Sequence, residues 1–183
     1  KGYDIVALVP SCALMLKFEW PLILPEDENV KRLSEATFDA AEYIVDIAKK
    51  EGLVDGLEKL EGSVSLHLAC HARAQNMGPK AAEMLRLIPD TKVEVIERCS
   101  GHGGSWGIMK DNFDTAIKIG RLAARKALES EAAYVVSECP LAREHMMQGI
   151  EKLDDENKAS AIEAVQHPIQ ILAKAYGLNS GEK

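Results

Sequence analysis

The sequence lacks any run of hydrophobic residues long enough to cross a bilayer, so no segment is expected to span a membrane. It also lacks an excess of basic residues: the formal net charge is -7 and the isoelectric point is near 5.3. Surfaces that bind nucleic acids or anionic membranes are usually basic. We therefore expect neither partner, and attachment to a membrane would be peripheral, through another protein.

The first residues, KGYDIVALVP, lack both an initiator methionine and the pattern of a signal peptide. They enter a strand-like apolar segment almost at once. A length of 183 residues fits about one domain. We expect residues 1–183 to be a single domain from a longer, multidomain chain, located in the cytoplasm or at the inner face of the membrane.

Cysteine is scarce, and no two cysteines form a CxxC pair. This scarcity excludes a small disulfide-stapled scaffold, and the missing pairs exclude a zinc ribbon or a local ferredoxin motif. The spacing of the cysteines alone is a weak signal, so any site must come from their structural context. The four are Cys12, Cys70, Cys99 and Cys139.

Apolar segments that read as strands alternate with segments of helical periodicity. The expected strands are 3–12, 63–70, 92–99 and 132–139. The expected helices are 26–52 (one helix or two), 74–89, 111–130, 140–153 and 167–177, with 13–24 as a short helical turn or loop. Strands separated by helices favour parallel pairing with crossovers. The predicted fold is α/β: a Rossmann-like open parallel sheet of about four strands with helices on both faces.

Each of the four cysteines stands at the C-terminal end of an expected strand. In a parallel sheet these ends share one edge, which is where open α/β folds bind ligands. Cysteines far apart in the sequence would then meet in space. Four thiolates suffice to bind a 4Fe-4S cluster, a zinc ion or a single iron.

Several neighbours of the cysteines could support such a site. Helix N-termini are expected after Cys70, Cys99 and Cys139, and their free N–H groups favour negative charge. Glycines allow backbone N–H groups to approach sulfur, and histidines can donate to sulfur or replace a thiolate. His167 fits a helix N-cap equally well. The candidates are His71, His102, Arg73, Ser100, Gly101, Gly103 and His167, with Arg98 as a further nearby cation.

The glycine-rich stretch GHGGSWG follows an expected strand and precedes an expected helix, as a dinucleotide-binding loop would. With Gly101 and Gly103 in the fingerprint, the third glycine would fall at position 106, which is Trp. No Lys-Ser or Lys-Thr pair follows, so the stretch is not a P-loop either. A nucleotide site is not expected here.

Four motifs, PSCALMLKFEWP, HLACHARAQNMG, RCSGHGGSWG and SECPLA, resemble those of the cysteine-rich CCG domain. That family occurs in one of the subunits of heterodisulfide reductase and in the iron–sulfur subunit of anaerobic glycerol-3-phosphate dehydrogenase. The resemblance covers about residues 3–177, and the chain looks like the second, C-terminal domain of a tandem pair. It implies electron transfer through a cysteine-bound cluster, from a flavin partner towards a quinone or another carrier.

The chain departs from that family at two positions. Ser100 follows Cys99 where the family has adjacent cysteines, and Ala142 stands where many members complete a CxxC motif after Cys139. Two customary ligands are therefore missing. The resemblance therefore does not imply the larger non-cubane clusters here. The two missing cysteines also argue against catalytic disulfide reduction.

The leading hypothesis is an electron-transfer domain that binds one 4Fe-4S cluster through Cys12, Cys70, Cys99 and Cys139. Its expected partner is a flavoprotein or a ferredoxin-like electron-transfer subunit, and no catalytic residue of its own is expected. An alternative is a structural or partner-docking domain that binds zinc or mononuclear iron. A third reading is a disulfide oxidoreductase that uses a reactive thiol pair and needs no metal. A disulfide, for instance between Cys70 and Cys99, is a further option for these cysteines.

Overall fold

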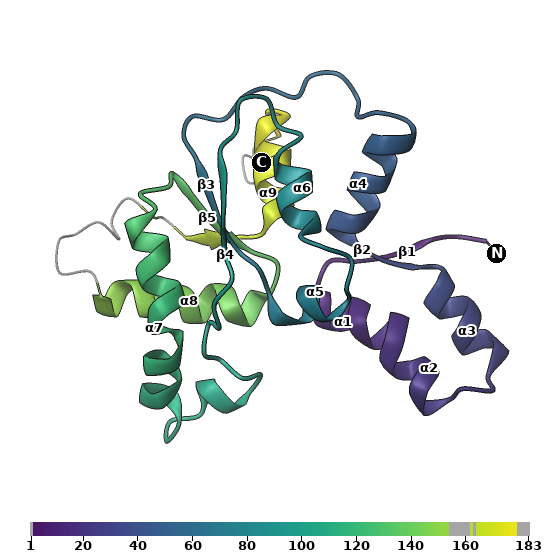
Figure 1. Cartoon of the computed structure of the whole chain (residues 1–183), viewed down its shortest axis with the longest axis horizontal. Coiled ribbons are helices and arrows are strands. Elements are labelled where there is room, and N and C mark those ends of the chain that lie inside the picture. The colour runs from purple at the N-terminus through teal and green to yellow at the C-terminus, as the bar shows by residue number, and fades with distance from the viewer. Residues whose placement is uncertain (1, 154–161, 163, 179–183) are drawn as a thin grey trace.

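The computed structural model describes residues 2–153, 162 and 164–178, and the structural statements below concern these residues. Its centre is a parallel sheet (Figure 1). The strand order in this sheet is β4-β3-β5-β6. The strands are β3 (Val64–His67), β4 (Val93–Ile96), β5 (Tyr134–Ser137) and β6 (Val165–Gln166). The predicted α/β fold with an open, four-stranded parallel sheet is confirmed.

Helices cover both faces of this sheet (Figure 1). One face packs against α4 (Ala40–Lys50), α6 (Lys80–Leu85) and α9 (Pro168–Ala175). The other face packs against α7 (Phe113–Glu129) and α8 (Pro140–Leu153). A parallel sheet covered by helices on both faces buries side chains on both, and the central strands β3 and β5 are accordingly buried along almost their whole length.

Strand β5 shows this two-sided burial within two residues. Val135 belongs to the core formed with α7 and α8, whereas Val136 belongs to the core formed with α4, α6 and α9. Successive side chains of a strand point to opposite faces, so both valines are buried although they are neighbours.

The N-terminal part forms a second, smaller sheet, and here the prediction was wrong. The expected strand over 3–12 is only β1 (Ile5–Ala7), and it pairs in parallel with β2 (Thr37–Asp39), not with the main sheet. Instead of a short turn or loop over 13–24, helical structure runs from Pro10 to Ile23. It consists of α1 (Pro10–Leu14), a π-helical stretch (Met15–Glu19) and α2 (Trp20–Ile23).

Prolines explain this error. Pro10 lies in the first turn of α1, where a missing N–H disrupts no helical hydrogen bond, so it begins a helix and does not end a strand. Pro21 lies just after the π-helical stretch, and the helical backbone continues through it. As a consequence, Cys12 lies inside α1 and not at the end of a strand.

The segment 26–52, expected to form one helix or two, contains α3 (Glu28–Glu35) and α4, with the unexpected strand β2 between them. Asp39 caps α4: its side chain accepts the Ala41 N–H at 3.0 Å, and its own N–H donates to Glu42 Oε2 at 3.1 Å. This capping box is a start signal visible in the sequence. Strand β6 was also missed, because two residues are too few to show a strand pattern.

Candidate functional site

The main sheet changes its direction of winding next to β3. Strand β4 follows β3 in the chain and lies on one side of it, whereas β5 lies on the other side. The segments that leave β3 and β5 therefore diverge, and such a switch point opens a crevice at the carboxyl edge of the sheet. Cys70 begins α5 (Cys70–Ala74) after β3, and Cys139 directly precedes α8 after β5.

A cavity of about 270 Å³ lies at this edge. Cys70, Cys99 and Cys139 all line it, so the structure brings three of the four predicted thiols to one place. The wall also contains five of the predicted neighbours, which are His71, Arg73, Ser100, His102 and Gly103, and the further cation Arg98.

Cys12 is not among the residues that line this cavity. It is an exposed residue of α1, and α1 packs directly against α5, the helix that begins with Cys70. The fourth thiol therefore lies near the site on α1 and not on the main sheet. Helix α1 belongs to the N-terminal unit, which consists of β1, β2 and the helices between them.

The loop after Cys99 presents a backbone donor to sulfur. The N–H of Gly101 donates to Cys99 Sγ at 3.3 Å. No helix begins directly after Cys99, contrary to expectation: a short 3₁₀ helix (Trp106–Ile108) comes first, and α7 starts only at Phe113. Negative charge on this sulfur is thus stabilised by a backbone amide of the loop and not by a helix N-terminus.

His102 connects the Cys99 loop to Cys139. Its Nδ1 accepts the N–H of Gly104 at 2.9 Å, so in the neutral ring the proton is on Nε2. Nε2 lies 3.8 Å from Cys139 Sγ and is oriented as a weak donor to it. His71 has a comparable position, with Nδ1 3.7 Å from Cys70 Sγ. Two histidines therefore each contact a thiol of the cavity.

Glycines also hold the Cys99 loop against α7. A Cβ at Gly101 would overlap the carbonyl oxygen of Ala116, and a Cβ at Gly120 would overlap the carbonyl oxygen of Ser100. Gly101 also has a φ of +90°, which side chains rarely adopt. The loop can therefore lie directly on the helix backbone only because both positions are glycine.

The remaining predicted neighbours occupy different surroundings. Arg73 makes an exposed, long ion pair of 4.0 Å with Glu97, and Ser100 is buried. His167 is the N-cap of α9: its Nδ1 accepts the Ile169 N–H at 3.1 Å, and its Nε2 donates to the Leu8 carbonyl at 3.0 Å. Both ring nitrogens of His167 are thus engaged away from the thiols.

The donor set suits a soft metal or an iron–sulfur cluster, since it combines free thiols with imidazole. Cys12, Cys70 and Cys99 are exposed and Cys139 is half-buried, and none is in a disulfide. Across the described residues, no three His, Cys, Asp or Glu side chains are close enough together to hold a metal ion. Binding would therefore require these accessible thiols to turn toward one another.

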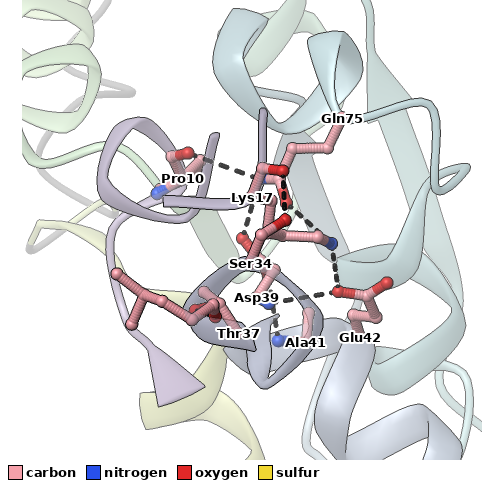
Figure 2. A network of polar contacts seen from close by, with 9 residues as sticks. Pro10, Lys17, Ser34, Thr37, Asp39, Ala41, Glu42 and Gln75 are labelled. Carbon is pink, nitrogen blue, oxygen red and sulfur yellow. Dashed lines mark hydrogen bonds and ion pairs between the residues drawn. The ribbon is translucent and has the colours of Figure 1, made fainter. Parts of the chain in front are cut away.

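A buried polar network, which sequence reasoning missed, joins α1 to α5 (Figure 2). Gln75, at the end of α5, donates from Nε2 to the Pro10 carbonyl and to Asp39 Oδ2, both at 3.3 Å. Lys17 donates to Gln75 Oε1 at 3.3 Å and to Glu42 Oε2 at 2.6 Å. The helix that carries Cys12 is thus held to the helix that begins with Cys70.

Glu138 is a second residue that the sequence did not reveal. Both of its carboxyl oxygens are buried and have no hydrogen-bond partner among the described residues. Burial, with smaller contributions from the negative charges of Asp39 and Cys139, raises the pKa of Glu138 to about 8. The carboxyl group beside Cys139 is therefore mainly neutral at pH 7.

Comparison with known families identifies the segment that contains this cavity. Residues 64–143, from the start of β3 to the first turn of α8, match the family model of the cysteine-rich domain, CCG. This segment is similar to CCG cysteine-rich domains. It contains Cys70, Cys99 and Cys139, whereas Cys12 precedes it.

Curated relatives extend the similarity of this chain beyond the matched segment. One subunit of anaerobic glycerol-3-phosphate dehydrogenase from Escherichia coli K12, designated C, is 28% identical over 176 residues, which is 96% of this chain and 41% of the relative. One subunit of dihydromethanophenazine:CoB–CoM heterodisulfide reductase from Methanosarcina acetivorans, designated D, is 27% identical, covering 92% of this chain and 40% of the relative. An uncharacterized iron-sulfur protein of Methanocaldococcus jannaschii is 27% identical, covering 72% and 27%.

The chain thus spans about two fifths of the length of the first two of these relatives. The predicted resemblance to the CCG family is confirmed. In the part of the chain that the structure describes, none of the helices combines the length and the apolar character needed to cross a membrane.

Proposed function

We propose that this chain is an iron–sulfur electron-transfer domain that binds one 4Fe-4S cluster through Cys12, Cys70, Cys99 and Cys139. The observation that carries the proposal is the shared cavity, in which thiols from three strand-end segments meet at the switch point of the sheet. The names of the relatives support it: one is an iron-sulfur protein, and two are subunits of a dehydrogenase and a reductase.

Cys12 is the proposed fourth ligand because of its position on α1. This helix packs on α5, and the Gln75 network holds the two helices together. With Cys12 included, four thiolates are available although the chain lacks cysteine at positions 100 and 142. Four is the number that an ordinary cubane cluster uses.

The surroundings of the thiols would help to balance the negative charge of four thiolates. The Gly101 N–H donates to Cys99 Sγ, and the proton on His102 Nε2 is directed at Cys139 Sγ. Arg73 and Arg98 line the same cavity and add positive charge. A bound cluster would supply one-electron redox chemistry, and donors of this kind to sulfur raise its reduction potential.

The proposed role is relay and not substrate chemistry. The edge of the sheet is open, with exposed Cys70 and Cys99, so that an electron donor or acceptor could approach it. We propose a flavoprotein or ferredoxin-like partner as the donor, and a quinone or another carrier as the acceptor. The proposed location is the cytoplasm, or the inner membrane face where a partner binds there.

Anaerobic reconstitution with iron and sulfide tests this proposal. We expect about four iron and four sulfide ions per chain and a reduced-state EPR signal of a 4Fe-4S cluster. Cys70→Ser and Cys12→Ser should lose or alter the signal, whereas the control Ser11→Ala, next to Cys12 on α1, should retain it. If all four thiols still react with an alkylating reagent after reconstitution, the proposal is contradicted.

One observation favours a second candidate, a domain that binds zinc or mononuclear iron. His71 and His102 each approach a thiol of the cavity, and three thiols with one imidazole form a common zinc site. Elemental analysis of anaerobically purified protein separates the candidates. One metal ion per chain without inorganic sulfide would support the second and contradict the first.

A further inference from the structure

His67 occupies a special position between the three segments that carry the cavity thiols. It is the last residue of β3 and is only 2% exposed. Its Nδ1 lies 3.0 Å from Ser137 Oγ and its Nε2 lies 2.9 Å from the Arg98 carbonyl oxygen. One side chain thus bridges the ends of β3 and β5 and the segment after β4.

The two contacts determine the tautomer of His67. A carbonyl oxygen can only accept, so Nε2 carries the proton and donates to Arg98. Nδ1 is then the acceptor, and the hydroxyl of Ser137 donates to it. Burial, the largest cause, lowers the pKa of His67, in agreement with a neutral ring.

The bridge begins where the backbone ladder of the sheet ends. In the register of the sheet, His67 is the last position of β3 paired with β4 and with β5, opposite Ile96 and Ser137. Beyond this point the backbone makes one more bond, from the Leu68 N–H to the Ile96 carbonyl at 3.1 Å. The side chain of His67 reaches further, to the residue directly before Cys99.

Each end of the bridge is close to a thiol in the sequence. His67 precedes Cys70 by three residues, Arg98 directly precedes Cys99, and Ser137 precedes Cys139 by two residues. His67 is thus distinguished from His71 and His102, which contact sulfur directly, and from His167, which caps a helix.

We propose that His67 is a positioning residue: through its bonds to the Arg98 carbonyl and the Ser137 hydroxyl, it sets the relative placement of the Cys70, Cys99 and Cys139 segments. The role of these thiols as ligands rests on the proposed function, whereas the bridge itself does not. Without it, the three segments would be joined by a ladder that ends before the cysteines and by the weak contact of His102 with Cys139. Their thiols would then meet less often in the arrangement that a metal requires.

Two single substitutions of His67 should separate its two bonds. In His67→Gln the amide nitrogen can replace the Nε2 donor to Arg98, whereas in His67→Asn the amide oxygen can replace the Nδ1 acceptor of Ser137. His67→Leu removes both bonds. Ser137→Ala removes only the bond to β5, and its matched control is Ser65→Ala. Ser65 is a serine of β3 with 0% exposure whose hydroxyl has no partner in the described residues.

The first measurement uses reduced, metal-free protein and a short dithiol cross-linker, with peptide mass spectrometry to identify the linked pairs. We expect Ser137→Ala and His67→Gln to lower the Cys70–Cys139 yield severalfold relative to Cys70–Cys99. His67→Asn should instead lower the Cys70–Cys99 yield relative to Cys70–Cys139. Ser65→Ala should give the same yields as the parent. Equal yields in the parent and in all bridge variants would overturn the proposal.

The second measurement uses reconstituted protein. The bridge variants should broaden or shift the EPR signal and change the midpoint potential, whereas Ser65→Ala should change neither. If the parent binds no iron, the proposed function fails, and the cross-linking still decides the role of His67. If circular dichroism shows His67→Leu to be unfolded, the pair Ser137→Ala and Ser65→Ala decides alone, and identical behaviour of that pair would overturn the proposal.

Discussion

The two regions that supply the cysteines hold them in different ways. At the edge of the main sheet, three thiols follow strands that pair directly with one another, and glycines allow their loops to pack closely. In the N-terminal unit, Cys12 lies on a helix that contacts the site region through a side-chain network around Gln75. The first region depends on backbone pairing and close contact, and the second depends on a few polar side chains.

This difference has a physical consequence for disruption. A parallel ladder distributes its hydrogen bonds over several residues, so one lost side chain leaves most of it intact. A network that converges on one amide loses several bonds at once and leaves buried groups without partners. We therefore expect changes at Gln75 to act mainly on Cys12, and changes at the sheet edge to act on the other three thiols.

The largest expected effect is at the sheet edge, with Gly101→Ala. The added Cβ would overlap the Ala116 carbonyl oxygen in a backbone conformation that alanine rarely adopts. Urea unfolding should show a loss on the order of 3 kcal/mol, together with reduced iron uptake. The control Gly104→Ala shares a positive φ of +66°, but its added Cβ would meet no heavy atom within 4 Å, so its loss should be about 1 kcal/mol. Equal losses would mean that contact with α7 is unimportant.

The second effect concerns the N-terminal unit. Gln75→Leu removes the bonds to Pro10 and Asp39 and leaves a buried carboxyl group without this donor. We expect a loss of about 2 kcal/mol in the free energy of unfolding. In metal-free protein, alkylation of Cys12 should become faster while that of Cys70 changes little.

Gln148→Leu is the control for this change, because Gln148 is a half-buried glutamine of α8, on the other face of the main sheet. It should leave the alkylation of Cys12 unchanged. If Gln75→Leu accelerates the alkylation of all four cysteines equally, the two regions are not held independently.

The third effect is the response of the sheet edge to acid. Burial, aided by the charge of His102, keeps the pKa of folded His67 below its ordinary value. The unfolded chain therefore binds a proton first as the pH falls, and stability present above pH about 6.5 is lost below it. Metal-free parent should lose about 1 kcal/mol more than His67→Gln between pH 7.5 and pH 5.5, measured by urea unfolding. Identical losses in the two proteins would show that His67 is not kept neutral by burial.

Acid should act in the opposite direction on the N-terminal unit. Burial raises the pKa of Asp39, so folding favours its protonated form, and the stability contributed by that form is lost as the pH rises through the folded pKa. The raised pKa of Glu138 gives the Cys139 end of the sheet edge the same sign, so in urea unfolding Glu138→Gln should lose less stability than the parent as the pH rises from 5.5 to 7.5.

The smallest expected effect is at Arg73, whose ion pair with Glu97 is long and exposed. Arg73→Gln should change the free energy of unfolding by less than about 0.5 kcal/mol. In reconstituted protein it should nevertheless lower the midpoint potential, because a positive charge that favours the reduced state is lost from the cavity wall. The control Arg86→Gln lies after α6 and should leave the potential unchanged.

Local patterns in the sequence predicted the main sheet well and the N-terminal unit poorly. The strands around Val64, Val93 and Tyr134 have alternating or continuous apolar residues and are separated by helices, so their type and parallel pairing followed directly. In the N-terminal unit, apolar periodicity continues across Thr37–Asp39, and it concealed a three-residue strand between two helices. Only the capping box at Asp39 and Glu42 marked the boundary.

The sequence by itself determined that the chain is an α/β domain and that cysteines follow its central strands, because hydrophobic period and strand order along the chain are local properties. The glycines after Cys99 also indicated a tightly packed loop, since few other residues adopt its backbone conformation. Tertiary structure decided that β1 leaves the main sheet, that Gln75 joins α1 to α5, and that His67 joins the segments of three cysteines. These features depend on hydrogen bonds between residues far apart in the chain, and no periodicity or local propensity encodes such pairings.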